Sequence, residues 1–191
     1  MTGIDTEVGK TVVSAILVKA LEADYWKPVQ SGDLDYSDTM KVQEWSVGNA
    51  GTFYPEGFRL NTPASPHVSA RIDGVEIALS DFELPRTENH LVIEGAGGLM
   101  VPLNDHGDYI IDLLKNHASK IVLVSRNYLG SINHTLSSFE VLKSRGLKVD
   151  MLVFSGETNA ESEKAIINHI KPNSIPLIVI LIPTTVLTFY V

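Results

Sequence analysis

Short apolar runs alternate with segments of helical periodicity along most of this chain. The runs that indicate buried strands lie at Tyr25–Gln30, Leu91–Glu94, Lys120–Ser125, Met151–Ser155 and Leu177–Ile182. They are rich in β-branched residues and do not alternate strictly with polar ones, which is typical of parallel strands covered on both faces. Strands that alternate with helices predict βαβ units with right-handed crossovers. We therefore expect an α/β fold with a mostly parallel sheet and helices on both faces.

Apolar residues at helical spacing predict the helices that connect these strands. One stripe comprises Val12, Val13, Ile16, Leu17, Ala20 and Leu21. Similar stripes lie within residues 110–114, 132–142 and 160–170, whereas the turn-rich segment 49–63 predicts a long surface loop. Because no repeat or linker divides the chain, we expect residues 1–191 to form a single α/β domain.

The two ends of the chain depart from this pattern. Only two residues precede Gly3, so the first strand of the predicted sheet is missing, and we expect the natural chain to extend upstream. Residues 174–191 are atypical, because they are strongly apolar yet contain Pro176 and Pro183 and lack a basic flank. This composition favours a buried strand followed by an irregular end over a membrane helix.

Composition narrows the range of functions. The chain carries a formal net charge of −8, which argues against nucleic acid or an anionic membrane as the main partner, because both attract basic surfaces. An anionic nucleotide needs only a few well-placed cations. The chain has no cysteine and no secretory signal at its start, so we expect a protein of the reducing cytoplasm.

The first residues of the chain contain the clearest candidate chemistry. Gly3 and Gly9 flank a loop that leads directly into Lys10, Thr11 and an amphipathic helix. Glycines allow successive N–H groups to curl around phosphates, the lysine adds charge for the terminal phosphates, and the threonine hydroxyl can ligate Mg²⁺. Five residues separate the glycines, whereas the general motif has four. A plain helix-capping turn is the alternative, but the helix that follows favours nucleotide binding.

A second candidate lies where the strand predicted at 91–94 ends. Glu94 is followed by a glycine-rich run at 95–98. Ligands of open α/β sheets bind at the carboxyl edge of the strands. A carboxylate there can hold Mg²⁺, and the glycines let the backbone approach phosphates. The alternative is a tight turn with a solvated glutamate.

Lys27 and Asp38 are weaker candidates when each is taken alone. Lys27 interrupts an apolar strand, where a lysine is costly to bury unless it meets a negative group, and Pro28 after it indicates an edge or a bulge. Asp38 either stabilises a helix N-terminus or supplies a second carboxylate for magnesium. The residues by themselves leave both alternatives open.

Six segments, in the same order along the chain, resemble the dethiobiotin synthetases, which are ATP-dependent enzymes of biotin synthesis. The segments are Thr2–Thr11, Lys27–Gly32, Ser37–Asp38, Pro63–His67, Glu94–Gly98 and Leu129–His134. The five-residue spacing between the glycines is this family's own form of the loop. Six ordered matches are far more specific than any one of them.

The resemblance implies a cyclo-ligase. Such an enzyme carboxylates 7,8-diaminononanoate (diaminopelargonate) with CO₂ or bicarbonate and closes the ring to dethiobiotin, through a carbamate that ATP phosphorylates. Lys10 would hold the β- and γ-phosphates, and Lys27 would stabilise the carbamate and the transferring phosphoryl group. Thr6 and Ser31 would position the diamine.

The resemblance also implies the remaining ligand contacts. Thr11, Asp38 and Glu94 would hold Mg²⁺. The residues in contact with ATP would be Glu7, Val8, Gly9, Lys10, Thr11, Val12, Asp38, Glu94, Gly95, Ala96 and Gly97. Backbone N–H groups at Ser131, Ile132 and Asn133 would bind the substrate carboxylate. In this family the helix that starts there comes from a partner subunit, so a homodimer is expected.

Two other classes of protein stay open. A nucleotide-switch ATPase of the partitioning or metal-cluster type typically carries an extra lysine early in its phosphate loop, which residues 4–7 lack. A catalytically idle, synthetase-like regulatory domain is disfavoured by the joint presence of the candidate lysines and carboxylates. Ser155 stands where the family has an adenine-binding asparagine, so the sequence leaves the nucleotide preference open.

Overall fold

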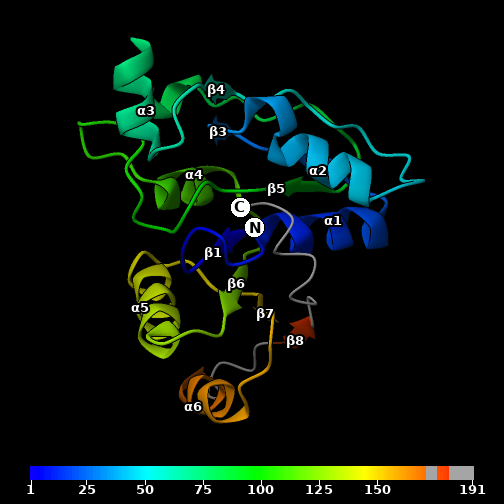
Figure 1. The fold of residues 1–191 in the computed structure, drawn as a ribbon, viewed down its shortest axis with the longest axis vertical. Coiled ribbons are helices and arrows are strands. Elements are labelled where there is room, and N and C mark those ends of the chain that lie inside the picture. Colours follow the sequence, from blue (N-terminus) through cyan, green and yellow to red (C-terminus); the bar gives the residue numbers. More distant parts are fainter. Residues whose placement is uncertain (171–175, 181–191) are drawn as a thin grey trace.

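The computed structural model describes residues 1–170 and 176–180 (Figure 1). The strands are β1 (Thr2–Gly3), β2 (Asp24–Trp26), β3 (Val29–Ser31), β4 (Phe58–Leu60), β5 (Leu91–Ile93), β6 (Val122–Arg126), β7 (Met151–Ser155) and β8 (Leu177–Ile180). The α-helices are α1 (Lys10–Leu21), α2 (Asp38–Trp45), α3 (Pro66–Asp73), α4 (Ile110–His117), α5 (Ser131–Ser144) and α6 (Ala160–Ile170). Short 3-10 helices cover Leu34–Tyr36 and Leu79–Asp81.

All pairs between these strands are parallel, which confirms the predicted α/β fold. The ladders run in the orders β1-β6-β7-β8, β2-β5 and β3-β4. Backbone hydrogen bonds join Met1 to Ile93 and Gly95, so β1 lies between β5 and β6. Figure 1 shows α2 and α3 beside β3 and β4 at one end, and α5 and α6 at the other. The carboxyl ends of the parallel strands therefore share one edge.

The first strand of the sheet is two residues long. Thr2 and Gly3 pair with Leu123 and Val124 of β6 in the middle of the sheet, and Thr2 is fully buried. These residues take the central position at which the sequence pattern lacked a strand.

The core consists of three apolar clusters that adjoin one another. The largest lies among β1, β6, β7, α4, α5 and α6, the second among β2 to β4, α3 and α4, and the third between α1, α2 and β2. Helix α4 faces two clusters, because Ile111 and Leu114 belong to the first and Ile110 and Leu113 to the second.

The stripe predicted for α1 is only partly right. Val13 is buried, but Ile16 and Leu21 are 42% and 49% exposed. The buried face of this helix instead includes Ala15 and Val18, whose side chains are smaller than isoleucine or leucine and pack against α2 and the sheet.

The other differences from the sequence prediction concern strand boundaries. The run predicted as one strand at Tyr25–Gln30 is divided into β2 and β3 at Lys27 and Pro28, because proline cannot donate to the ladder. The segment 49–63, predicted as a surface loop, contains β4, which pairs with β3. β6 covers Val122–Arg126, where a strand was expected at Lys120–Ser125.

The apolar C-terminal segment lies largely outside the described residues. A strand was predicted at Leu177–Ile182, and the structure has one at Leu177–Ile180, which pairs with β7. Residues 181–191 are not described. None of the described helices is long and apolar enough to cross a membrane.

Candidate active site

The phosphate loop joins β1 to α1 at the carboxyl edge of the sheet. Glu7 and Gly9 have φ values of 57° and 90°, so the backbone turns twice through the left-handed region before the helix starts at Lys10. Alternating left- and right-handed residues turn backbone N–H groups toward one side, which is how such loops bind anions. The free N–H groups at the start of α1 add to the same positive potential.

Neighbouring strands support this loop from behind. The Ser155 hydroxyl donates to the Val8 carbonyl, and Arg126 Nη1 donates to the Glu7 carbonyl at 3.1 Å. Ser155 is 1% exposed, so its hydroxyl is used to hold the loop. The residue that matches the family's adenine-binding asparagine therefore has a structural partner here.

The glycine-rich turn after β5 packs directly against the loop. Gly97 has a φ of 63°, and a Cβ there would lie 2.9 Å from Val101 Cγ2 and 3.5 Å from Thr6 Oγ1. Gly3 is equally restricted, since its Cβ would lie 2.7 Å from Val8 Cγ2. Both positions favour glycine because a Cβ would clash with a valine of the same loop, and Gly97 also has a positive φ.

Lys10 is buried at the mouth of the loop. Its ammonium donates to the Asp5 carbonyl at 2.8 Å, and its residue is 6% exposed. Burial disfavours the charged form, and together with the nearby Lys27 ammonium it lowers the pKa of Lys10 to about 8. The carboxylates of Glu94 and Asp38 act in the opposite direction. An anion bound in the loop would stabilise the charged form of this lysine.

Three of the predicted site residues form one buried cluster around Lys27. Its ammonium lies 2.5 Å from Asp38 Oδ2 and 3.2 Å from Glu94 Oε1. Glu94 Oε1 also accepts a hydrogen bond of 3.0 Å from the Thr11 hydroxyl, which links the cluster to the start of α1. The side chains of Lys27 and Glu94 are 5% and 1% exposed. The structure thus brings together residues of α1 and α2 and the residues that follow β2 and β5, which are far apart in sequence.

The charges in this cluster stabilise one another. Burial alone would lower the pKa of Lys27, but the carboxylates of Glu94 and Asp38 outweigh it and raise the pKa above its usual value. Burial alone would raise the pKa of Asp38, but the Lys27 ammonium outweighs it and lowers that pKa. Lys27 is therefore a permanent cation, and the reading of this lysine as a mere edge residue does not fit its position.

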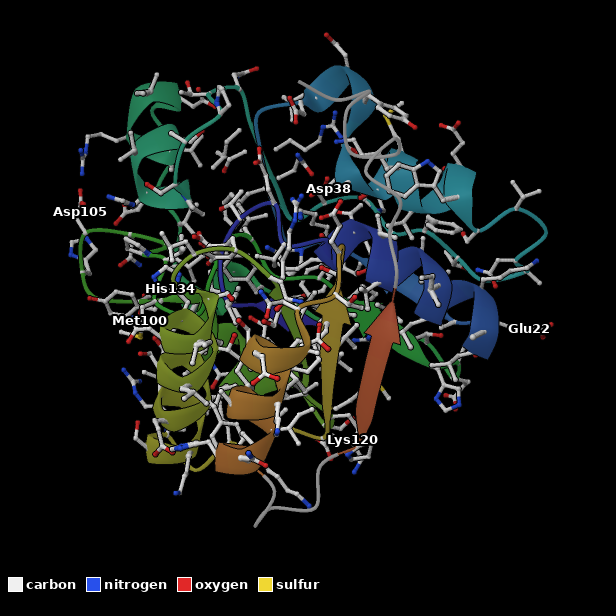
Figure 2. All side chains as sticks on the ribbon, turned by 60° about the horizontal axis from the view of Figure 1, so that its bottom comes forward. Glu22, Asp38, Met100, Asp105, Lys120 and His134 are labelled. Carbon is white, nitrogen blue, oxygen red and sulfur yellow. The ribbon has the colours of Figure 1, made fainter. Side chains whose placement is uncertain are left out.

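Asp38 is held by its own neighbourhood at the first residue of α2. Its backbone N–H donates to Gln30 Oε1 at 3.1 Å, and Ser37 caps the helix. Lys41, one turn further along, lies 3.6 Å from Asp38 Oδ1. Figure 2 shows Asp38 at the start of α2, close to α1. Asp38 therefore starts a helix and also pairs its carboxylate with Lys27, while its role as a magnesium ligand stays a prediction.

The donor atoms of Thr11, Asp38 and Glu94 fit Mg²⁺. They are hard oxygen atoms, which this ion prefers. Within residues 1–170 and 176–180, no group of three or more His, Cys, Asp or Glu side chains gathers into a metal site. Mg²⁺ is usually held by one or two carboxylates together with substrate phosphates and water.

Thr6 and Ser31 are the two residues predicted to position the diamine. The Thr6 N–H donates to Asp5 Oδ1 at 2.7 Å, and its side chain faces the turn at Gly97. Ser31 ends β3, and its buried hydroxyl has no protein partner among the described residues. A hydroxyl in this state is available for a ligand.

The residues predicted to bind a carboxylate lie apart from the cluster. Ser131, Ile132 and Asn133 form the first turn of α5, after Gly130, whose φ is 104°. No hydrogen bond or ion pair in the described part of the chain joins them to Lys27, and Leu129 before them is fully exposed.

Sequence reasoning missed two side chains beside the cluster. Tyr25 is fully buried, and its hydroxyl donates to Glu94 Oε2 at 3.0 Å. The signal for it was its spacing, because Tyr25 and Lys27 are two residues apart in the run predicted as one strand, and such residues point to the same face. Lys41 was missed because its charge resembles that of any exposed helix residue.

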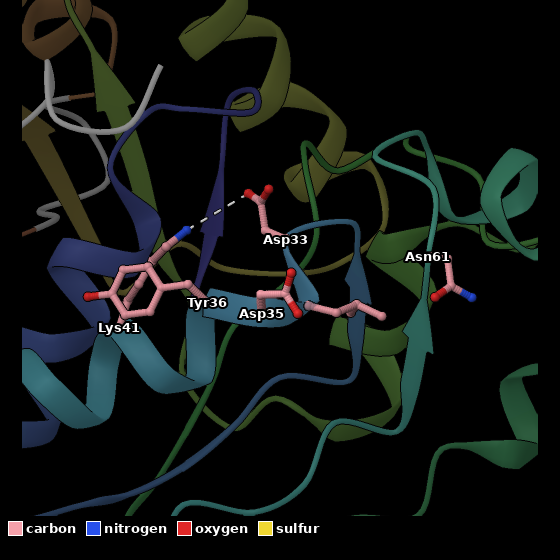
Figure 3. A pocket seen from close by; sticks show the side chains of 6 residues that line it. Asp33, Asp35, Tyr36, Lys41 and Asn61 are labelled. Carbon is pink, nitrogen blue, oxygen red and sulfur yellow. Dashed lines mark ion pairs between the residues drawn. The ribbon is translucent and has the colours of Figure 1, made fainter.

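A hollow of about 620 Å³ opens next to Asp38. It is lined by Asp33, Leu34, Asp35, Tyr36, Lys41 and Asn61 (Figure 3). Lys41 lies 3.9 Å from Asp33 and 5.5 Å from the centre of the Tyr36 ring. Because Lys41 also contacts Asp38, the hollow adjoins the charged cluster.

The fold and the loop define a class of protein, the phosphate-loop nucleotide-binding α/β proteins. Comparison with known families agrees, since the model of a family described as an AAA domain matches residues 1–187.

Curated relatives identify the family within that class. The chain is 53% identical over 166 residues to the ATP-dependent dethiobiotin synthetase BioD of Christiangramia forsetii, covering 87% of this chain and 79% of the relative. It is 48% identical over 170 residues to that of Cytophaga hutchinsonii, with 88% and 82% covered. For Rhodopseudomonas palustris the identity is 48% over 167 residues, with 87% and 78% covered. The chain belongs to the dethiobiotin synthetase family, which confirms the resemblance.

Proposed function

We propose that this protein converts diaminopelargonate, CO₂ and ATP to dethiobiotin, ADP and phosphate. The observation that carries the proposal is the buried Lys27 ammonium, which lies between Glu94 and Asp38 beside the phosphate loop. Every step of this reaction gathers negative charge, so a preorganised cation at that point would supply much of the catalysis. We also propose that residues 1–191 act as one nucleotide-binding domain, in the cytoplasm.

The phosphate loop would bind ATP. Backbone N–H groups of Glu7 to Val12 would surround the phosphates, and Lys10 would turn from the Asp5 carbonyl to the β- and γ-phosphates. The turn from Gly95 to Gly97 would face the same phosphates. Thr11, Asp38 and Glu94 would hold Mg²⁺, which neutralises the developing charge during phosphoryl transfer.

Lys27 would act on the other substrates. One amine of the diamine attacks CO₂ and loses a proton, which gives a carbamate, and the Lys27 ammonium stabilises its negative charge. The carbamate oxygen then attacks the γ-phosphorus and releases ADP. The second amine attacks the carbonyl carbon, the C–O bond to phosphate breaks, and the five-membered ring closes. Positioning and charge suffice for these steps, so no side chain has to act as a nucleophile.

Two features near the cluster support binding of a diamine. The Ser31 hydroxyl is buried without a protein partner, and the hollow beside Asp38 has room for an aliphatic chain. Thr6 would orient the same substrate.

The carboxylate end of the substrate would be bound across a dimer interface. The first turn of α5 offers backbone N–H groups at Ile132 and Asn133, whereas the Ser131 N–H already donates to the Tyr128 carbonyl at 3.0 Å. Leu129 and Ile132 are 103% and 37% exposed beside this turn. Exposed apolar residues of this kind favour an interface between two copies. We therefore propose a homodimer in which each α5 completes the site of the other subunit.

Mass spectrometry of the reaction mixture tests the function. Purified protein with diaminopelargonate, bicarbonate, Mg²⁺ and ATP should form dethiobiotin, and ADP formation should depend on the diamine. If the protein is folded and forms no dethiobiotin, the proposal is refuted. ATP hydrolysis at a rate that does not depend on the diamine would favour a nucleotide-switch ATPase. Lys27→Ala should lose nearly all turnover, and activity within a few-fold of the wild type would refute the carbamate role.

A further inference from the structure

Glu94 is the most completely coordinated side chain of the cluster. Its Oε1 accepts hydrogen bonds from the Thr11 hydroxyl at 3.0 Å and from Lys27 at 3.2 Å. Its Oε2 accepts one from the Tyr25 hydroxyl at 3.0 Å. Thr11 and Lys27 lie on the side of the phosphate loop, so Tyr25 is the donor that holds the carboxylate from the opposite side.

The Tyr25 ring is held rigidly in the core. It is fully buried in the cluster that includes Val18 and Val42, and its centroid lies 6.2 Å from that of Phe53. Apolar contacts of this kind would be made equally well by phenylalanine. What the hydroxyl adds is a hydrogen bond to Glu94 in a region from which water is excluded.

The backbone fixes the same pair of residues. β2 and β5 are parallel, with Tyr25 opposite Val92, and the Glu94 N–H donates to the Trp26 carbonyl at 3.0 Å. Main chain and side chain of Glu94 are thus both held by one strand.

We propose that Tyr25 is a positioning residue for Glu94: its hydroxyl fixes Oε2 so that Oε1 faces Thr11 and the metal–phosphate site. This inference rests on the proposed function for the role of Glu94 as a metal ligand. Outer partners of this kind commonly change metal affinity when they are removed, because the ligand loses its orientation.

Tyr25→Phe tests the proposal, with Tyr54→Phe as the matched control. Tyr54 also donates its hydroxyl to a carboxylate, Asp24 Oδ2 at 3.3 Å, but Asp24 lies outside the charged cluster. Binding of Mn²⁺ in the presence of ADP is measured by electron paramagnetic resonance. We expect the dissociation constant to rise about tenfold in Tyr25→Phe and to stay within about twofold in Tyr54→Phe. The proposal would be overturned if Tyr25→Phe bound Mn²⁺ as tightly as the wild type, or more tightly.

A double-mutant cycle separates positioning from a general loss of structure. In a Glu94→Gln background, Tyr25→Phe should have no further effect on Mn²⁺ binding, because the carboxylate on which it acts is absent. A further loss of the same size would overturn the proposal, since the hydroxyl would then act through another group. Failure of the wild type to form dethiobiotin would refute the proposed function alone, because the Mn²⁺ measurements do not depend on turnover.

Discussion

Replacing Lys27 by methionine removes the cation that lies between the buried carboxylate of Glu94 and the carboxylate of Asp38, whose side chain is 21% exposed. With an effective dielectric constant of about 20, an ion pair at the 3.2 Å separation of Lys27 and Glu94 is worth about 5 kcal/mol, and the pair with Asp38 is closer still. Burial of the ammonium offsets several kcal/mol of this attraction. Removing one partner of such a pair leaves the other charges uncompensated, so we expect the free energy of unfolding to fall by about 3–5 kcal/mol.

Urea denaturation of Lys27→Met in the presence of EDTA measures this loss. Lys120→Met is the control, because Lys120 pairs with Asp150 at 3.0 Å but is 77% exposed. Figure 2 shows Lys120 at the opposite end of the sheet from Asp38. The control should lose at most about 1 kcal/mol. Mg²⁺ should recover stability in Lys27→Met more than in the wild type, since the two carboxylates then lack a competing cation.

Either of two results would refute this reasoning. If Lys27→Met were no less stable than Lys120→Met, the cluster would not be held by charge compensation. If Mg²⁺ stabilised the wild type and Lys27→Met equally, Lys27 and the metal would not share the carboxylates of Asp38 and Glu94.

Three further predictions follow from the geometry. Folding lowers the pKa of Lys10 from 10.5 to about 8, so between these pH values the unfolded chain binds a proton that the folded chain does not. The free energy of unfolding should therefore rise with pH across this range, by about 3 kcal/mol relative to Lys10→Met, as measured by urea denaturation at each pH. If the difference in the free energy of unfolding between the wild type and Lys10→Met did not change with pH, this would contradict the buried position of the lysine. Gly97→Ala should lower the free energy of unfolding by about 1–3 kcal/mol more than Gly74→Ala does. The two glycines have similar φ values of 63° and 67°, but only at Gly97 would the added Cβ meet a close side chain. Urea denaturation of both variants measures the difference, and equal losses of stability would exclude a steric cause. Leu129→Glu should shift the protein toward monomers in analytical ultracentrifugation without unfolding it, and an unchanged dimer would place the interface elsewhere.

The parts of the site that could be predicted are those encoded by adjacent residues. The phosphate loop and the turn after Glu94 depend on glycines at fixed positions, and their backbone geometry follows from local sterics. The fold class could be predicted for the same reason, because parallel strands buried on both faces need continuous apolar runs. The six-segment resemblance then joined these local signals into one function.

The parts that sequence alone did not resolve depend on packing between distant segments. The role of Lys27 was undecided because its two carboxylates come from α2 and from the end of β5, and only the folded chain brings them within 2.5 and 3.2 Å. Tyr25 resembles any buried aromatic residue until β5 places Glu94 beside its hydroxyl. The pairing of β3 with β4 was missed because the turn-rich composition around Phe58 outweighed a three-residue strand.

The charge balance of the cluster indicates how the site would treat its substrates. Two ammonium groups, of Lys10 and Lys27, face two carboxylates, of Asp38 and Glu94, so the side chains are close to neutral together. ATP with its metal ion and a carbamate would both add negative charge. The surplus must therefore be met by groups that carry no formal charge, namely the N–H groups of the phosphate loop and the start of α1. These backbone groups cannot be removed by changing a side chain, whereas the lysines can. Substitution of either lysine should consequently weaken catalysis more than it weakens nucleotide binding by the loop itself.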